Sequence, residues 1–177
     1  MMNSGISRIL EEFRDDVHNP ISSSIPAIVG LPDENNPFNW RVSFFCQNES
    51  PYKGGLFYLS LVFPQNYPYS PPEVKFITPI YHLNVKHTRD ISGPIGKVDL
   101  SILNMWRPEY KVKDIIISVY SLFLMNKDFS SFSMDMSEEY INNKNLYIEK
   151  CRYFTQKYAK PEIGYKEYDN WDFSYGH

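Results

Sequence analysis

Apolar positions follow two different periods along the chain, helical at its start and alternating in its middle. Residues 6–18 carry apolar side chains on one stripe, and Asn19-Pro20 interrupts the pattern, which predicts a helix. Residues 21–37 are rich in Ser, Pro and Asn and predict a loop with at most one short strand. Three segments then alternate with period two between turn-rich pieces, which predicts neighbouring strands. They are "NWRVSFFCQ", "GLFYLSLVFP" and "EVKFI".

The C-terminal half predicts helices again. Residues 111–127, "KVKDIIISVYSLFLMNK", are strongly apolar, which favours a buried central helix. Residues 135–160 open with a capping-box pattern at Asp135, break near Asn142-Asn143 and stop before Pro161, which predicts two helices. The order of helix, strand meander and helices, without repeats or a dividing linker, predicts a single α+β domain. Its antiparallel sheet is covered on one face.

Composition and charge exclude several classes of protein. Hydrophobic residues make up 42% and aromatic residues 16% of the 177 residues, too many for a disordered chain. The net charge is -3 and Lys and Arg are scattered, which disfavours a nucleic-acid partner, because phosphate binding needs a focused basic patch. The sequence shows no signal peptide and no membrane-spanning apolar run. A soluble intracellular protein is expected, cytoplasmic with the nucleus as a second location.

Cysteine usage predicts neither a disulfide framework nor a metal site. The two cysteines are Cys46 and Cys151, and no CxxC pair or Cys/His cluster occurs. Cys46 shares a strand face with Trp40, and Cys151 shares a helical stripe with Tyr147. Both thiols are expected to be buried and unreactive, because a reactive thiol needs exposure and a positive neighbourhood. No cofactor and no metal ion are expected.

Three motifs in residues 50–84 occur together and in order. They read P-Y-x-G-G-x-F, F-P-x-x-Y-P-x-x-P-P and Y-H-x-N, and "WRP" follows them. In this combination the chain resembles the ubiquitin-conjugating enzyme (UBC) family over roughly residues 4–160. The resemblance implies a UBC-like fold with an N-terminal helix, a four-stranded antiparallel meander, a central helix and two C-terminal helices. It also implies a cis Tyr67–Pro68 bond.

Residues 161–177 lie beyond the resemblance and interleave aromatic with acidic side chains. This C-terminal extension either folds back over the domain or forms a partner-binding segment. Packing back is favoured, because so many exposed aromatic side chains would be a liability.

The resemblance places a candidate site in "GKVDLSIL". Active members carry a nucleophilic cysteine in a sequence resembling G-x-I-C-L-D-I-L, so Asp99 matches the cysteine and Ser101 the aspartate. A shifted alignment puts Gly96 at the cysteine instead. A thiolate is a good nucleophile and leaving group, whereas a carboxylate is a poor nucleophile for such acyl transfer. The site is therefore interpreted as degenerate and the chain as not an enzyme. Asn84 is expected to order the loop rather than stabilise an oxyanion, and His82 to be structural.

Asp99 has apolar neighbours in the sequence and follows a loop longer than the family norm. Burying an ionised carboxylate without partners costs several kcal/mol. Asp99 is therefore expected to be partly exposed, or to accept hydrogen bonds from the backbone between Ser92 and Lys97. Lys97 and Arg107 are candidate ion-pair partners.

Residues for partner binding follow from the same resemblance. Ubiquitin ligases dock on family members at an aromatic side chain between the prolines and at a loop resembling W-S-P-A. The matching residues are Tyr69 and the four residues Trp106, Arg107, Pro108 and Glu109. Arg107 and Glu109 alter the second loop, so ligase docking and an ordinary turn stay open as alternatives.

The first predicted helix carries a net acidic outer face, whereas active relatives present a basic face to the activating enzyme. The charged residues are Arg8, Glu11, Glu12, Arg14, Asp15 and Asp16. This difference disfavours charging by the usual route, and a solvated amphipathic face is the simpler interpretation.

Two functions stay open. The first is a catalytically inactive UBC-like protein that acts as a scaffold or adaptor, either as a ubiquitin-conjugating enzyme variant or as a Fused Toes-type adaptor subunit. Its partners would be an active ubiquitin-conjugating enzyme, ubiquitin or a transport-adaptor complex. The second is an active conjugating enzyme for ubiquitin or a ubiquitin-like protein that uses an unrecognised nucleophile.

Overall fold

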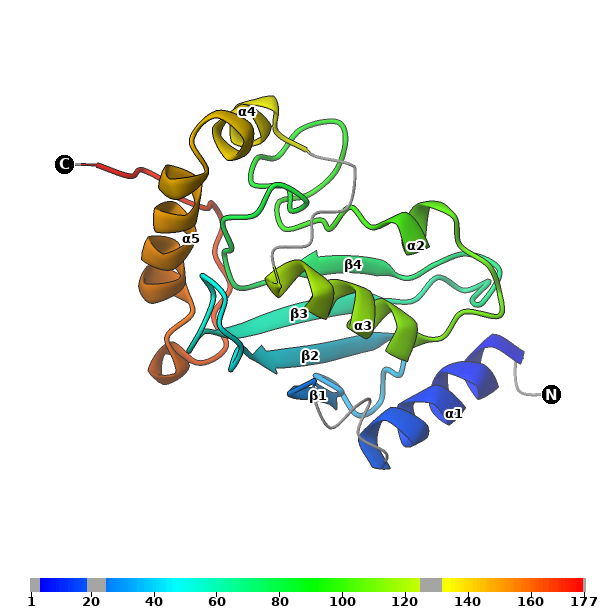
Figure 1. The fold of residues 1–177 in the computed structure, drawn as a ribbon. Helices are drawn as coiled ribbons and strands as arrows, with labels where there is room; N and C mark the ends of the chain where they lie inside the picture. Colours follow the sequence, from blue (N-terminus) through cyan, green and yellow to red (C-terminus); the bar gives the residue numbers. More distant parts are fainter. Residues whose placement is uncertain (1–3, 19–24, 125–131, 177) are drawn as a thin grey trace.

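A four-stranded sheet, a central helix across it and helices at both ends make up the fold (Figure 1). The computed structural model describes residues 4–18, 25–124 and 132–176. The helices are α1 (Ser4–His18), α2 (Ser101–Asn104), α3 (Val112–Phe123), α4 (Met134–Asn142), α5 (Lys144–Tyr158) and the 3-10 helix η1 (Pro161–Ile163). The strands are β1 (Ala27–Gly30), β2 (Asn39–Phe45), β3 (Leu56–Val62) and β4 (Glu73–Phe76). The α+β plan predicted from the sequence is confirmed.

The sheet is a meander in the order β1-β2-β3-β4, and each strand is antiparallel to its neighbour. Trp40 of β2 pairs with Leu61 of β3, and Phe44 pairs with Phe57. These four side chains are buried, so the alternation in the sequence gives one continuous apolar face. The short strand allowed within residues 21–37 is β1.

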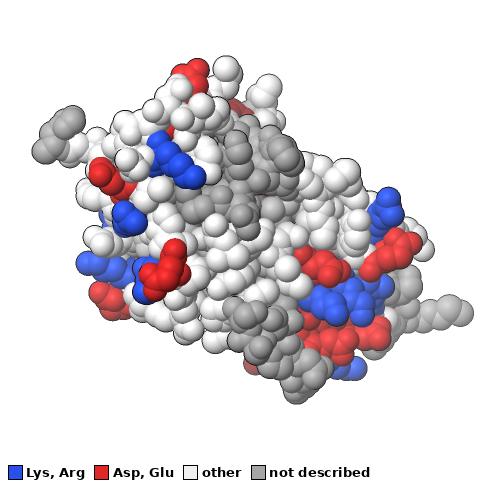
Figure 2. Space-filling model, in the orientation of Figure 1, with Lys and Arg blue, Asp and Glu red and all other residues white. Residues whose placement is uncertain are grey.

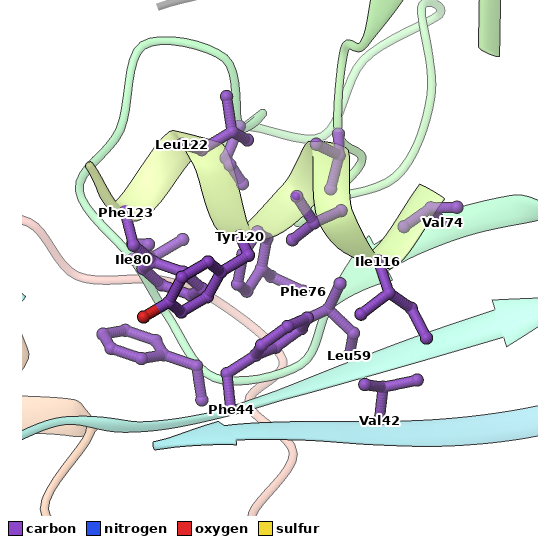
Figure 3. Packing of buried hydrophobic residues seen from close by; sticks show 14 of the residues in the cluster. Val42, Phe44, Leu59, Val74, Phe76, Ile80, Ile116, Tyr120, Leu122 and Phe123 are labelled. Atoms are coloured by element: carbon purple, nitrogen blue, oxygen red, sulfur yellow. The ribbon is translucent and has the colours of Figure 1, made fainter. Parts of the chain in front are cut away.

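Helix α3 covers the apolar face of the sheet (Figure 3). The ring centroid of Phe123 lies 5.6 Å from that of Phe44 and 5.0 Å from that of Phe57. The labelled residues in this layer come from β2, β3, β4, the segment after β4, and α3: Val42, Phe44, Leu59, Val74, Phe76, Ile80, Ile116, Tyr120, Leu122 and Phe123. The buried central helix is confirmed as far as Phe123, and the last predicted turn lies outside the described residues.

Side-chain caps begin the last two helices. The Ser133 hydroxyl accepts a hydrogen bond from the Met136 N–H at 3.2 Å and caps α4. The predicted cap, Asp135, is instead inside the first turn. The Asn143 side chain accepts from the Leu146 N–H at 3.3 Å and caps α5. The predicted break between the two helices is therefore confirmed, and asparagine causes it by offering the new helix a cap.

Glu12 of α1 corrects the prediction of a fully solvated outer face. Its side chain is buried, with 3% exposed. The carboxylate accepts hydrogen bonds from the Arg8 side chain, the Tyr67 hydroxyl at 2.9 Å and the Val112 N–H at 2.7 Å. It joins α1 to the turn before β4 and to the first residue of α3, which the helical spacing alone could not reveal.

Charged side chains of both signs gather over α1 and over α5 on the face shown in Figure 2. Neither group forms a field of one sign on that face. This distribution fits the scattered charges in the sequence. None of the described helices is long and apolar enough to cross a membrane.

Candidate functional site

Asp99 lies between an isolated bridge of the chain and the start of α2. Its N–H donates to the Asn84 carbonyl at 2.9 Å, and the Asn84 side-chain amide donates to the Asp99 carbonyl at 3.4 Å. The half-buried carboxylate accepts a hydrogen bond from the Asn104 side-chain amide at 2.8 Å. The predicted local hydrogen bonding is confirmed, but its donor belongs to α2 instead of the preceding loop.

A groove of about 580 Å³ opens beside Asp99. Pro71, Pro94 and Leu103 contribute apolar walls, and Glu73 and Asp99 contribute carboxylates. These residues come from the turn before β4, from β4, from the loop after it and from α2. The tertiary structure thus assembles one concave surface around the predicted site residue from segments that are far apart in the sequence.

His82 and Asn84 are both buried and serve the backbone around Asp99. The His82 Nδ1 accepts a hydrogen bond from the Asn84 N–H at 3.0 Å. Burial lowers the pKa of His82 to about 4, and a hydrogen bond with the Leu122 backbone opposes that shift. His82 is therefore neutral near pH 7. These contacts favour the loop-ordering role predicted for Asn84 and the structural role predicted for His82.

A braced segment, residues 86–97, hereafter the site loop, forms one side of the groove. The Lys86 side chain is buried, with 3% exposed, and its ammonium group lies 2.7 Å from both Asp90 Oδ2 and Ser92 Oγ. The hydrogen bonds from Lys86 and Ser92 hold the pKa of the Asp90 carboxyl below its usual range. Lys97 donates to the Ser92 carbonyl at 3.2 Å. Lys86 was not predicted as a site residue, and the available signal in the sequence was its spacing of four residues from Asp90.

Gly96 fixes the site loop to the end of β4. Its φ of 86° lies in the left-handed region, and an added Cβ would approach the Phe76 carbonyl oxygen to 2.1 Å. The Phe76 N–H donates to the Gly96 carbonyl at 2.8 Å, and the Gly96 N–H donates to the Lys86 carbonyl at 2.6 Å. Glycine is needed here both for the backbone conformation and for the close approach.

The two thiols of the chain lie inside the core. Cys46 and Cys151 are fully buried, which confirms their predicted burial. Burial raises the pKa of each thiol to about 12. The Cys151 thiol donates to the Tyr81 carbonyl at 3.3 Å. Neither group is a thiolate near pH 7, so neither is an accessible nucleophile in this conformation.

The residues predicted for partner binding lie next to each other. The Trp106 indole N–H donates to the Pro68 carbonyl at 2.7 Å, which joins the residue 106–109 loop to the turn that carries Tyr69. Tyr69 is 76% exposed, and the neighbouring Met105 is 67% exposed. Arg107 and Glu109 are exposed and Pro108 is half-buried. We call Tyr69, Met105 and residues 106–109 the turn surface.

The bond between Tyr67 and Pro68 is cis, as predicted. Ser101 is the first residue of α2 and is half-buried. Within residues 4–18, 25–124 and 132–176, no group of three His, Cys, Asp or Glu side chains could hold a metal ion.

The C-terminal extension packs on the domain, as predicted. Tyr168, Trp171 and Phe173 lie against the hydrophobic core. The boundary drawn at residue 160 between domain and extension stays a prediction.

Comparisons with known proteins agree with this architecture. The family model described as "Ubiquitin-conjugating enzyme" matches residues 8–155. The ubiquitin-conjugating enzyme E2 N of Drosophila melanogaster is 33% identical over 159 residues, which cover 89% of this chain and 98% of that protein. The ubiquitin-conjugating enzyme E2 T of Xenopus laevis is 28% identical over 141 residues, covering 77% and 70%.

A solved structure shows the same fold. The E2 domain of a Toxoplasma gondii ubiquitin-conjugating enzyme superposes with a TM-score of 0.73 at 24% identity, over 87% of this chain and 98% of that one. The expected UBC-like arrangement is therefore confirmed.

The comparisons contradict the prediction that the chain is not an enzyme. The matching family model describes an enzyme, and the two relatives are named as ubiquitin-conjugating enzymes. The prediction relied on one aligned position, Asp99, and that alignment itself stays a prediction. One aligned position is weaker evidence about activity than a family match that extends over residues 8–155.

Proposed function

Because the chain belongs to the ubiquitin-conjugating enzyme family, we propose that it works in a ubiquitin-type conjugation pathway as a protein-binding scaffold or adaptor. Its proposed partners are an active ubiquitin-conjugating enzyme, ubiquitin, or a transport-adaptor complex of the Fused Toes type. The proposed location is the cytoplasm, with the nucleus as a second one. The observation that carries the proposal is the turn surface, where exposed Tyr69 and Met105 stand on a fixed frame.

The physical support is preorganisation. The hydrogen bond from Trp106 to the Pro68 carbonyl fixes the two segments, so a partner does not have to order them. Exposed tyrosines commonly act as anchors at protein interfaces, because they bury a large area with little loss of side-chain freedom. The Asp99 groove adds a concave surface whose walls are partly apolar.

A second candidate function is conjugation by the chain itself, using an unrecognised nucleophile. The similarity to named ubiquitin-conjugating enzymes favours it. The burial of Cys46 and Cys151 restricts this second function, because either thiol would have to become exposed before it could carry an acyl group. Both candidates concern the same pathway and differ in whether ubiquitin becomes covalently attached to this chain.

The first test measures binding by titration calorimetry against ubiquitin and against an active ubiquitin-conjugating enzyme. Tyr69→Ala should raise the Kd at least about tenfold, the effect of losing an interface anchor. Ile141→Ala removes a side chain of α4 that is 71% exposed and serves as the matched control. If both substitutions weakened binding equally, or if neither weakened it, the turn surface would not be the binding site.

The second test separates the two candidates. The chain is incubated with activating enzyme, ATP and ubiquitin, and adducts are resolved with and without reductant. A scaffold that binds its partners non-covalently predicts binding without a reductant-sensitive adduct. An adduct that is lost in Cys46→Ser or Cys151→Ser would favour conjugation by the chain itself and would overturn the scaffold proposal.

A further inference from the structure

The segment after η1, residues 164–176, hereafter the strap, returns along α5 (Figure 1). Its first aromatic residue lies on the outer face of the sheet. The guanidinium carbon of Arg41 is 3.6 Å from the centroid of the Tyr165 ring, and the Tyr58 ring centroid is 5.5 Å away. Arg41 and Tyr58 alternate with buried residues of β2 and β3. Tyr165 therefore covers the face opposite to α3.

Further along, the strap is fixed to α5. The Phe173 ring centroid lies 4.7 Å from that of Phe154. The Tyr158 hydroxyl donates to the Asp172 carbonyl at 2.6 Å, and Lys157 pairs with the Asp172 carboxylate at 3.2 Å. The ion pair is exposed and contributes little. The contact between Phe173 and Phe154 and the hydrogen bond from the buried Tyr158 give the strap a defined position.

Between these attachments the strap meets the site loop. A narrow cavity of about 80 Å³ lies between them. The site loop lines it with Arg89, Pro94 and Ile95, and the strap lines it with Glu167, Tyr168, Asp169 and Trp171. The cavity is too small for an organic ligand, and its walls include the end of β4. The His87 ring centroid is 5.9 Å from that of Phe173, which adds a second contact between strap and loop.

The site loop therefore has two kinds of support. Its polar side is braced internally by Lys86, Asp90 and Ser92. Its apolar residues Pro94 and Ile95 face the strap across the narrow cavity. Removal of the strap would expose Pro94 and Ile95 further to water and leave the loop supported by its internal polar contacts and by β4.

We infer that the strap positions the site loop, with Trp171 and Phe173 as positioning residues that hold it against the end of β4. Because Ser92 and Lys97 of this loop line the groove beside Asp99, the strap also sets the shape of that groove. The strap, which begins on the outer face of the sheet and continues along α5, thereby controls a surface on the opposite side of the loop. The inference concerns loop geometry and stands whichever partner the groove takes.

Amide hydrogen exchange on the 177-residue chain tests this inference. The reporters are the N–H groups of Lys86, Gly96 and Lys97, which donate to carbonyls within the site loop. In Trp171→Ala these amides should exchange about tenfold faster or more, while β2 and β3 amides change less than about twofold. Trp171→Phe should restore slow exchange, because it retains an aromatic ring at the contact.

Tyr175→Ala is the matched control. Tyr175 belongs to the strap and packs against Tyr153 of α5, with ring centroids 5.3 Å apart. Its removal should leave exchange in the site loop unchanged. An equal acceleration in both variants, or in loop and sheet together, would mean that the strap only stabilises the whole domain.

A second pair of variants approaches the contact from the other side. Ile95→Ala should accelerate exchange in the same loop amides, and combining it with Trp171→Ala should add little. If Trp171→Ala does not fold, Trp171→Leu and Ile95→Ala can be used instead to compare amide exchange in the site loop with exchange in β2 and β3. Unchanged loop exchange in folded Trp171 variants would overturn the inference.

Discussion

Glu12 in α1 and Asp99 before α2 carry the same charged group in different surroundings. Glu12 is 3% exposed and accepts hydrogen bonds from Arg8, Tyr67 and Val112. Asp99 is half-buried, and its side chain accepts from Asn104, five residues away. Glu12 joins three segments of the fold, whereas Asp99 stabilises a short local turn beside an open groove. A carboxylate with several buried donors is structural, and one at a groove wall is available for recognition.

Glu12→Gln should have the largest effect. The substitution keeps the size but places an amide N–H₂ against donors and leaves the Arg8 charge without its partner. Arg8 stays partly solvated, with 27% of its side chain exposed, so the main cost comes from the buried donors left without an acceptor, about 1–3 kcal/mol for each and more for groups that lose a charged partner. We expect a loss of unfolding free energy of that order in urea denaturation. Glu11→Gln, at the exposed neighbouring position, should be nearly neutral. Similar losses in both variants would contradict the structural role of Glu12.

Gly96→Ala tests the Asp99 region and comes next. The added Cβ meets both a positive φ and the Phe76 carbonyl oxygen. A strained φ alone costs about 1–3 kcal/mol, and the clash adds to it. Gly54 also has a positive φ, of 80°, but its Cβ would meet nothing within 4 Å. Gly54→Ala therefore measures the cost of the backbone strain alone. The difference between the urea midpoints of the two variants gives the additional cost of the clash with Phe76. An equal cost would show that the loop can move away from β4.

Asp99→Asn should cost about 1 kcal/mol or less, because the Asn104 amide can still donate to the remaining oxygen. Thermal unfolding with a binding assay checks this expectation. Asp99→Leu removes both oxygens and is the more disruptive partner variant. Lost binding at unchanged stability in Asp99→Asn would make Asp99 a recognition residue and sharpen the contrast with Glu12.

Asp16→Asn should have the smallest effect on stability, and it should stabilise the protein where the preceding substitutions destabilise it. Burial, with Glu12 and Asp15 nearby, raises the pKa of Asp16 to about 6. A raised carboxyl pKa means that the folded state favours the protonated form, so its contribution is present below about pH 4 and lost as pH rises through 6. Asp16→Asn should therefore stabilise the protein at pH 7 by less than about 1 kcal/mol, since solvent screens the site. Unfolding at pH 4 and pH 7 tests this, with exposed Asp15→Asn as control.

The sheet and the central helix were predictable because their residues repeat a pattern. Phe44, Leu59 and Phe123 lie on faces that the period of the strands or helix already defines. The break at Asn143 and the burial of both cysteines were predictable for the same reason. Short polar features were harder: α2 was missed, since four residues give no period, and Ser133 was missed as the cap of α4.

The candidate site divides in the same way. The resemblance to the ubiquitin-conjugating enzyme family pointed to Asp99, Asn84, His82 and the turn that carries Tyr69. Spacing could not identify Lys86 as a buried brace, because lysine is ordinarily exposed and only its contacts with Asp90 and Ser92 stabilise it inside the loop. Helical spacing also assigned Glu12 to solvent, because it predicts on which side of the helix a residue lies but not which other segments pack against that side.

The sequence by itself determined the order of the elements, their buried faces, the turn-rich segments between the strands, and the motifs that carry the family resemblance. Those properties depend on near neighbours and on repeating patterns. Only the tertiary structure decided which polar groups meet, such as Glu12 with Val112, and that Trp171 and Ile95 line one cavity beside the end of β4. Such pairs join residues some 75 to 100 positions apart in the sequence, and packing of the whole chain sets their separation.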